Sequence, residues 1–192
     1  EIRPKDLQSI EKKFSTLPLI SSDRRLSVIF LGSINDKNVD IRIRINSNKY
    51  AELTLKIGDF HSHDRAEITQ KINPDQFIGL VHIFSQFGFS IKVMQRKTKR
   101  FFSEKEGYEL ALVDAQKIDY VEIEKVLDTS NKDIIEQERN NLEKVLQSAN
   151  MVLINKEQFD NLCDRLTKEV DWVFNCSKED YSRLESELSD FL

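Results

Sequence analysis

The sequence predicts an α+β protein in which an antiparallel sheet of about eight strands is flanked by helices. Short stretches in which charged residues alternate with apolar ones are typical of strands, because successive side chains of a strand point to opposite faces. Brief polar segments separate these stretches, as expected for hairpin turns. Elsewhere, apolar residues recur every three or four positions, as on helices. The 192 residues are enough for one substantial domain.

The N-terminal residues predict a short strand followed by a helix. Residues 1–5 alternate in character, as a first strand does. Asp6 is a favourable N-cap for the helix, and Pro18 ends the helical pattern. The apolar face of this helix consists of Leu7, Ile10, Phe14 and Leu17.

Four strands and a helix are expected in the next part of the chain. The strands cover residues 26–31, 39–45, 50–57 and 64–72. Polar turns connect the first three strands, and a loop that contains Gly58, His61 and His63 precedes the fourth. Pro74 lies in the first turn of the predicted helix, where proline is favoured, and Gly88 ends it.

Three further strands and then three helices complete the predicted order. The strands cover residues 90–102, 107–113 and 118–127. The remaining chain is helical in pattern, with helices from residue 130, over 156–174 and over 177–191. The spacing of Trp172, Phe174 and Tyr181 indicates helix packing rather than ligand binding.

Basic side chains recur at every second position of several predicted strands. A solvated face explains such a pattern on a single strand. Here the pattern is repeated with hardly any Ser or Thr between the charges, and like charges on a curved sheet repel each other unless an anion neutralises them. A phosphate chain fits, because guanidinium groups bind phosphate oxygens in a two-pronged manner and lysines act as point charges. The recurring basic residues are Arg42, Arg44, Lys56, Arg65, Lys97 and Lys99.

Carboxylates alternate with apolar residues in the same way at Glu67, Glu122 and Glu124. Their oxygens are the hard ligands that Mg²⁺ or Mn²⁺ prefers, and such a metal links protein carboxylates to substrate phosphates. A basic wall and an acidic wall that face each other would hold a triphosphate.

The order of these motifs resembles the CYTH superfamily, the triphosphate tunnel metalloenzymes that include class IV adenylate cyclases, thiamine triphosphatases and inorganic triphosphatases. Members carry an opening Glu-x-Glu-x-Lys strand, then Arg-x-Arg, Thr-Leu-Lys, Arg-x-Glu-x-Glu, Lys-x-Arg and a closing Glu-x-Glu strand. This chain offers corresponding residues in the same order. They are Arg42 with Arg44, Thr54 to Lys56, Arg65 with Glu67, Lys97 with Lys99, and Glu122 with Glu124.

The resemblance implies an antiparallel β-tunnel with flanking helices over residues 1–165, and a C-terminal helical extension, residues 166–192, packed on it. It implies hydrolysis of inorganic triphosphate or a small organic triphosphate, with Mg²⁺ or Mn²⁺ as cofactor. The alternatives are a class IV adenylate cyclase and a non-catalytic module that binds polyphosphate or a nucleotide. The implied phosphate-binding residues are Arg3, Lys5, Arg42, Arg44, Lys56, Arg65, Lys97 and Lys99. The implied metal ligands are Glu1, Glu67, Glu122 and Glu124.

The opening motif fits the chain in two registers. We favour residues 1–5, because this choice leaves the first helix intact, and residues 9–13 are the alternative. In the favoured register, Arg3 replaces the second glutamate of the motif.

Later motifs also depart from the family pattern. Thr69 replaces the last glutamate of the fourth motif, and Lys99 stands where arginine is usual. A further acidic residue, expected before the closing strand, is Asp114, although Val113 fits the spacing equally well. These departures thin the acidic wall, so the sequence predicts binding more firmly than catalysis.

The composition indicates no nucleic-acid or membrane partner. The formal net charge is -4, and the basic run 96–100 lacks the aromatic stacking residues of RNA-binding motifs. No apolar run approaches the roughly 20 residues of a membrane span. We therefore expect a cytoplasmic protein whose partner is a triphosphate-containing small molecule, and a homodimer is compatible with the sequence.

Other residues with metal-binding potential are explained more simply. His61 and His63 fit a solvated loop, and the two cysteines have no metal-ligand spacing. Because the sequence begins with Glu1 rather than Met, we expect that a preceding segment is missing.

Overall fold

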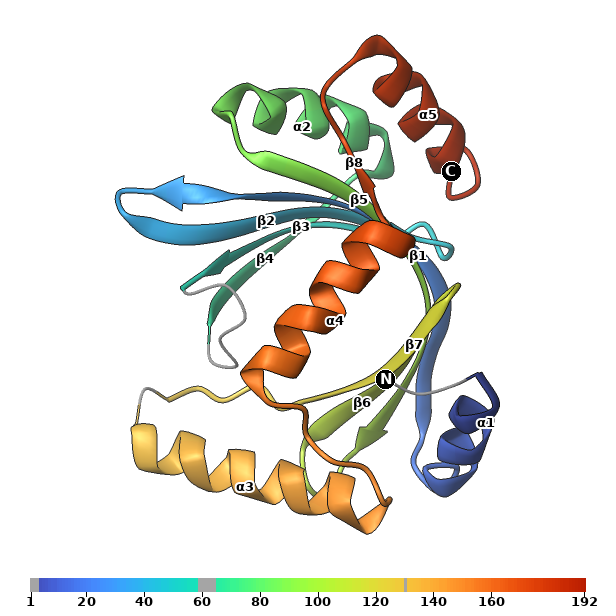
Figure 1. Ribbon diagram of the computed structural model, residues 1–192, viewed down its shortest axis with the longest axis vertical. Coiled ribbons are helices and arrows are strands. Elements are labelled where there is room, and N and C mark those ends of the chain that lie inside the picture. The colour runs from blue at the N-terminus through green and yellow to red at the C-terminus, as the bar shows by residue number, and fades with distance from the viewer. Residues whose placement is uncertain (1–3, 59–64, 130) are drawn as a thin grey trace. The chain divides into compact units, whose positions relative to one another are not determined.

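The computed structural model describes residues 4–58, 65–129 and 131–192 (Figure 1). The strands are β1 (Leu19–Ile34), β2 (Lys37–Asn46), β3 (Ala51–Ile57), β4 (Ala66–Ile72), β5 (Ser90–Ser103), β6 (Tyr108–Ala115), β7 (Ile118–Glu124) and β8 (Trp172–Val173). The helices are α1 (Pro4–Lys13), α2 (Phe77–Phe84), α3 (Lys132–Ser148), α4 (Lys156–Glu169) and α5 (Lys178–Leu188), and single 3₁₀ turns flank α2 at Pro74–Gln76 and Ser85–Phe87.

The strands form one antiparallel sheet in the order β4-β3-β2-β1-β5-β6-β7, with β8 paired to β5. Successive strands are joined by hairpins, as in β1–β2, β2–β3, β3–β4, β5–β6 and β6–β7. The predicted α+β class with an antiparallel sheet is therefore confirmed. In the part of the chain that the structure describes, β4 and β7 are the two edges and do not pair with each other, so the sheet is open.

The chain divides into two compact units. Unit 1 comprises residues 1–22 and 97–162, and unit 2 comprises residues 23–96 and 163–192. Each unit has its own apolar core, and the two cores are described separately below.

Unit 2 is built on strands that alternate between apolar and polar residues. Leu26, Val28 and Phe30 of β1 are fully buried, and the isoleucines of β2 lie beside them on the same face. Helices α2 and α5 cover this face through Phe77 and Leu184 (Figure 1). The period of two in the sequence thus places the apolar side chains of β1 and β2 in one core.

Residues after α4 form a strand rather than the predicted continuation of the helix to Phe174. The amides of Val170 and Asp171 both donate to the carbonyl of Leu166, which closes the helix. Trp172 and Val173 then pair with β5 as β8. Tertiary pairing with β5 therefore overrides the helical spacing that the sequence shows here.

An ion pair inside unit 2 holds the start of β8 against β5. Arg96 Nη1 lies 2.8 Å from Asp171 Oδ1, and these side chains are only 2% and 0% exposed. Lys92 Nζ lies 3.8 Å from the other carboxylate oxygen. Charges this deeply buried are tolerated only when they are paired, because desolvation of a lone charge costs several kcal/mol.

Unit 1 has a smaller core between α1, the strands of a hairpin and α3. Ile10 and Phe14 of α1 lie in one buried cluster with Phe101 and Leu110, and Ala149 at the end of α3 belongs to the same cluster. Asn131 is the N-cap of helix α3. Its side chain accepts hydrogen bonds from the backbone amides of Asp133 and Ile134, as is typical of this position.

The predicted first strand is wrong for Pro4 and Lys5, which belong to α1. Proline is favoured in the first turn of a helix, because its missing N–H would have no partner there. Residues 1–3 lie outside the described part. The alternative register at residues 9–13 is also helical. Strand β1 in turn begins at Leu19, earlier than the predicted residue 26.

We predict that Asp171→Asn lowers the free energy of unfolding by about 3–5 kcal/mol, because it leaves Arg96 charged and buried without a full counter-charge. Replacing both partners, Arg96→Met with Asp171→Leu, should recover most of the loss. Urea unfolding followed by circular dichroism measures both effects. Equal losses in the single and double variants would show that the ion pair is not the cause.

Candidate anion-binding site

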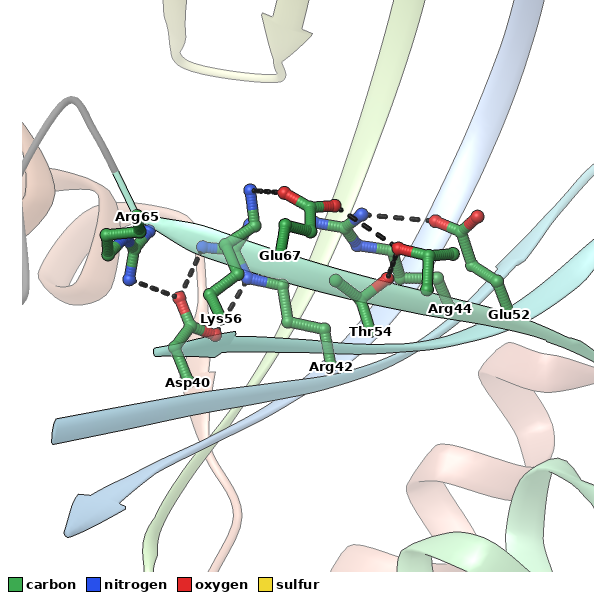
Figure 2. A network of polar contacts seen from close by, with 9 residues as sticks. Asp40, Arg42, Arg44, Glu52, Thr54, Lys56, Arg65 and Glu67 are labelled. Atoms are coloured by element: carbon green, nitrogen blue, oxygen red, sulfur yellow. Dashed lines mark hydrogen bonds and ion pairs between the residues drawn. The ribbon is translucent and has the colours of Figure 1, made fainter. Parts of the chain in front are cut away.

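The polar face of unit 2 lies on β2, β3 and β4, on the side of the sheet opposite the isoleucine core. Asp40, Arg42 and Arg44 alternate with the buried isoleucines of β2. Figure 2 shows these side chains on one side of the strands together with those of Lys56 and Glu67. The charged face that the alternation predicted is therefore present in this unit.

The register of the three strands arranges this face in three cross-strand rows. Residues directly opposite each other on neighbouring strands share a face and lie close together. The rows are Asp40–Lys56–Glu67, Arg42–Thr54–Thr69 and Arg44–Glu52–Lys71. The first and third rows alternate in charge, and the middle row places two hydroxyl groups beside an arginine.

Asp40 is the most deeply buried carboxylate of the face, with a side chain 3% exposed. Arg42 donates to both of its oxygens, from Nε at 2.8 Å and from Nη2 at 2.6 Å. Arg65 Nη1 donates to Oδ2 at 3.2 Å. Burial by itself raises the pKa of Asp40, but the bonds and charges of Arg42 and Arg65 outweigh burial and hold the pKa below its ordinary value.

Arg44 forms a second ion pair, with Glu52. Nη1 of Arg44 donates to Glu52 Oε1 at 3.1 Å, and both side chains are largely buried. Burial and the neighbouring Arg42 lower the pKa of Arg44, while Glu52 and Glu67 oppose that shift. A guanidinium stays protonated in proteins, so Arg44 is a cation held in a poorly hydrated place.

Lys56 forms the third ion pair, with Glu67 at 2.6 Å. Burial alone would raise the pKa of Glu67, but its bond to Lys56 and the charge of Lys56 prevail and lower it. Thr69 Oγ1 donates to Glu67 at 3.3 Å and lies 3.1 Å from Thr54 Oγ1. The Glu67 side chain is 42% exposed, so this carboxylate faces solvent.

These contacts bring four of the predicted phosphate-binding residues together on one face. The cations are Arg42, Arg44, Lys56 and Arg65, and the carboxylates that pair with them are Asp40, Glu52 and Glu67. The set therefore carries one more cation than carboxylate.

Unit 1 holds the other predicted basic residues, and the strand register separates them from its glutamates. Lys97 is opposite Asp114, and Lys99 is opposite Leu112. Glu122 is opposite Ala111, which is in turn opposite Arg100. Lys97 and Lys99 thus lie on the face of the apolar core of unit 1, whereas Glu122 lies on the other face.

Each lysine has a partner of its own in unit 1. Lys99 Nζ lies 2.7 Å from Glu11 of α1. Lys97 Nζ lies 3.7 Å from Asp114, and its side chain is 68% exposed. Burial raises the pKa of Asp119, and the charge of the neighbouring Asp114 adds to this shift. Asp114, which the sequence offered as a further acidic residue, thus lies beside Lys97 and Asp119 in unit 1.

The basic residue that shares a face with Glu122 and Glu124 is Arg100, which the sequence analysis did not select. Its Nε lies 2.7 Å from Glu109. In the run 96–100, basic residues occupy both even and odd positions, so the sequence did not show which of them point to which face of the strand. Phe101 lies in the buried core of unit 1. Lys97 and Lys99 precede it by four and two residues and therefore share its face, and this spacing is the signal in the sequence that could have shown their position.

The remaining predicted site residues are not part of either group. Glu1 and Arg3 lie outside the described residues, as do His61 and His63, which the sequence assigned to a solvated loop. Lys5 belongs to α1 rather than to a strand. Within residues 4–58, 65–129 and 131–192, no group of three or more His, Cys, Asp or Glu side chains is arranged to hold a metal ion.

Comparison with known proteins finds solved structures of similar fold. No protein-family model matches it, and no curated protein matches it. A conserved hypothetical protein of Pyrococcus furiosus, Pfu-838710-001, matches with a TM-score of 0.59 and 22% identity over 79% of this chain and 87% of that one.

Two proteins of Pyrococcus horikoshii OT3 match similarly. PH1819 has a TM-score of 0.57 and 19% identity over 86% of this chain and 96% of its own. PH1012 has a TM-score of 0.56 and 16% identity over 79% and 87%. At these identities the likeness shows a shared fold. Separately, none of the described helices has the length and apolar character needed to cross a membrane.

We predict that Asp40→Asn lowers the free energy of unfolding at pH 7 by about 2–3 kcal/mol, because Arg42 and Arg65 lose their shared counter-charge. The folded pKa of Asp40 lies below its unfolded value of about 3.9, so its contribution is complete above that pH and is lost as the pH falls through the folded pKa. Urea unfolding of both proteins between pH 7 and pH 2 should show the difference shrinking at the acid end.

The exposed Asp128 offers a matched control, since Asp128→Asn removes the same charge from a surface loop. This variant should leave unfolding unchanged at every pH. A stability difference for Asp40→Asn that stays constant down to pH 2 would contradict the assigned role of its charge.

Proposed function

We propose that the polar face of β2, β3 and β4 binds the phosphate chain of a triphosphate-containing small molecule. The observation that supports this most is the gathering of Arg42, Arg44, Lys56 and Arg65 on one partly buried face. Phosphate oxygens accept charge-assisted hydrogen bonds from such groups, and guanidinium groups bind them two at a time.

The carboxylates suggest how the face receives an anion. Asp40 is nearly inaccessible and is bonded to two arginines, so we infer that it stays in place and fixes Arg42 and Arg65. Glu52 and Glu67 are more exposed, and each pairs with a single cation. We infer that a phosphate chain displaces these two and gains Arg44 and Lys56 as partners.

Metal-dependent hydrolysis of a triphosphate is the second candidate, and the carboxylates of unit 1, considered by themselves, favour it. Glu109 and Glu124 are directly opposite each other, and Glu122 lies on the same face. Arg100 already neutralises Glu109, so a divalent cation on this face would be held by Glu122 and Glu124. These oxygen donors suit Mg²⁺ or Mn²⁺, and we propose that Glu122 and Glu124 hold such an ion, which when bound neutralises phosphate charge and orients the attacking group.

The group that attacks the triphosphate decides between two possible reactions. Water as the attacking group gives hydrolysis, and the ribose hydroxyl of ATP gives cyclisation, as in a class IV adenylate cyclase. We favour hydrolysis of inorganic or small organic triphosphate, because it requires fewer contacts beyond the phosphates. Without either reaction, the protein is a binding module.

We predict that inorganic triphosphate binds the protein and that Lys56→Gln weakens binding by about 10-fold or more, because one charge-assisted hydrogen bond is worth about 1.5–3 kcal/mol. Isothermal titration calorimetry at two salt concentrations measures the affinity and its salt dependence. Lys117→Gln is the matched control, because Lys117 is an exposed lysine in the turn between β6 and β7. Equal affinity of the Lys56 variant and the control variant would refute the proposed site.

We also predict that phosphate release from triphosphate requires Mg²⁺ or Mn²⁺ and that Glu122→Gln reduces it at least 10-fold while binding of triphosphate without metal is retained. The reason is that this variant removes a metal ligand but no phosphate-binding group. Phosphate release and calorimetry on the same preparations separate the two effects. Tight binding with no release under either metal would leave binding alone as the function.

A further inference from the structure

Strand β4 presents an unusually accessible sheet edge. It is the last strand of the sheet beside β3, and six of its seven residues are exposed. Ile68 is 62% exposed, which is high for a large apolar side chain in a strand. An edge of this kind can accept hydrogen bonds from a further strand, and proteins usually protect it with charges or bulges.

We propose that two copies of this chain associate by antiparallel pairing of their β4 strands, with the two-fold axis passing between the Thr69 residues. The sequence of β4 is complementary to itself in this register. Glu67 lies two positions before Thr69, and Lys71 lies two positions after it. Each Glu67 is therefore opposite the partner's Lys71, and the pair occurs twice.

Other registers lack this complementarity. An axis through Ile68 places Lys71 opposite the partner's Arg65, so two cations face each other. An axis through Gln70 leaves Glu67 opposite the partner's Asn73, beyond the end of the strand. Registers shifted by a single residue place the polar face of one copy beside the apolar face of the other, because side chains alternate with a period of two.

The apolar side of the strand also fits the register through Thr69. Ile68 is opposite the partner's Gln70, and Ala66 is opposite the partner's Ile72. The two exposed Ile68 side chains then lie on the same side of the pairing, on either side of the axis. Association therefore covers apolar surface that a single copy leaves in water.

Neither charged partner is fully used within one copy. Glu67 bonds Lys56 through Oε2 and accepts a longer bond of 3.3 Å from Thr69 through Oε1, and its side chain is 42% exposed, so it can reach a second cation. Lys71 Nζ lies 5.6 Å from the centre of the Tyr50 ring, an exposed contact that the lysine can leave at small cost. A lysine alone protects an edge against pairing, but a glutamate four residues earlier makes this edge attractive to its own copy.

Sedimentation velocity of the full chain over a range of concentrations tests the proposal. We expect a reversible monomer–dimer equilibrium for the natural sequence. Lys71→Glu places two carboxylates opposite each other, and Glu67→Lys places two ammonium groups there, so each variant alone should sediment as a monomer. An equimolar mixture of the two variants should form dimers again, because each pair then joins opposite charges. Lys117→Glu, the same charge change at an exposed turn, should leave the equilibrium unchanged.

A cysteine trap provides a second measurement that needs no charge reversal at Glu67. Thr69→Cys, made in a Cys176→Ser background, places two thiols directly opposite each other on the axis, within reach of a disulfide. Mild oxidation should link two chains, whereas Gln70→Cys in the same background should not, because Gln70 is opposite Ile68. A natural chain that stays monomeric up to about 1 mM, where association is worth less than about 4 kcal/mol, would overturn the proposal. So would mixed variants that stay monomeric while Thr69→Cys fails to cross-link.

Discussion

The alternation in β2 is the constraint on which both the core and the polar face of unit 2 depend. Ile41, Ile43 and Ile45 are buried among the residues of α2 and α5, so the residues between them must point the other way. A register shift of one residue would bury Arg44 in the core and expose three isoleucines. The pairing of β2 with its neighbours is therefore fixed by packing, and the positions of the charges follow from it.

Because the polar face is itself partly buried, its charges must be neutralised within the chain. Asp40 meets this need for Arg42 and Arg65 with a side chain that is almost inaccessible, whereas Glu67 meets it for Lys56 while exposed to solvent. Burial thus divides the carboxylates into a structural one and exchangeable ones. In the proposed anion site, this division would hold Arg42 and Arg65 in place while Lys56 changes partner.

Burial and charge also explain where the chain departs from local preference. The segment after α4 has helical spacing, yet Trp172 and Val173 pair with β5, and Asp171 pairs with Arg96 in a place where neither charge reaches water. Phe174, Leu184 and Leu188 lie in the same core as β1 and β2, so the C-terminal residues contribute to the packing of unit 2. At β4, by contrast, the charged residues remain at an open edge.

The sequence by itself determined the α+β class, most of the strands and the cations of the charged face on β2, β3 and β4, because the period of two is a local property of the chain. Only the tertiary structure decided the phase of β5, where charges occupy both alternating sets and pairing with β6 places Lys97 and Lys99 apart from Glu122. It also decided the partner of each charge, since Arg65 bonds Asp40 of β2 and Arg100 pairs with Glu109 of β6. Pro4 and Lys5 joined α1 because proline is favoured in the first turn of a helix. Trp172 joined β8 because long-range pairing with β5 outweighs the weak local preference of a short segment.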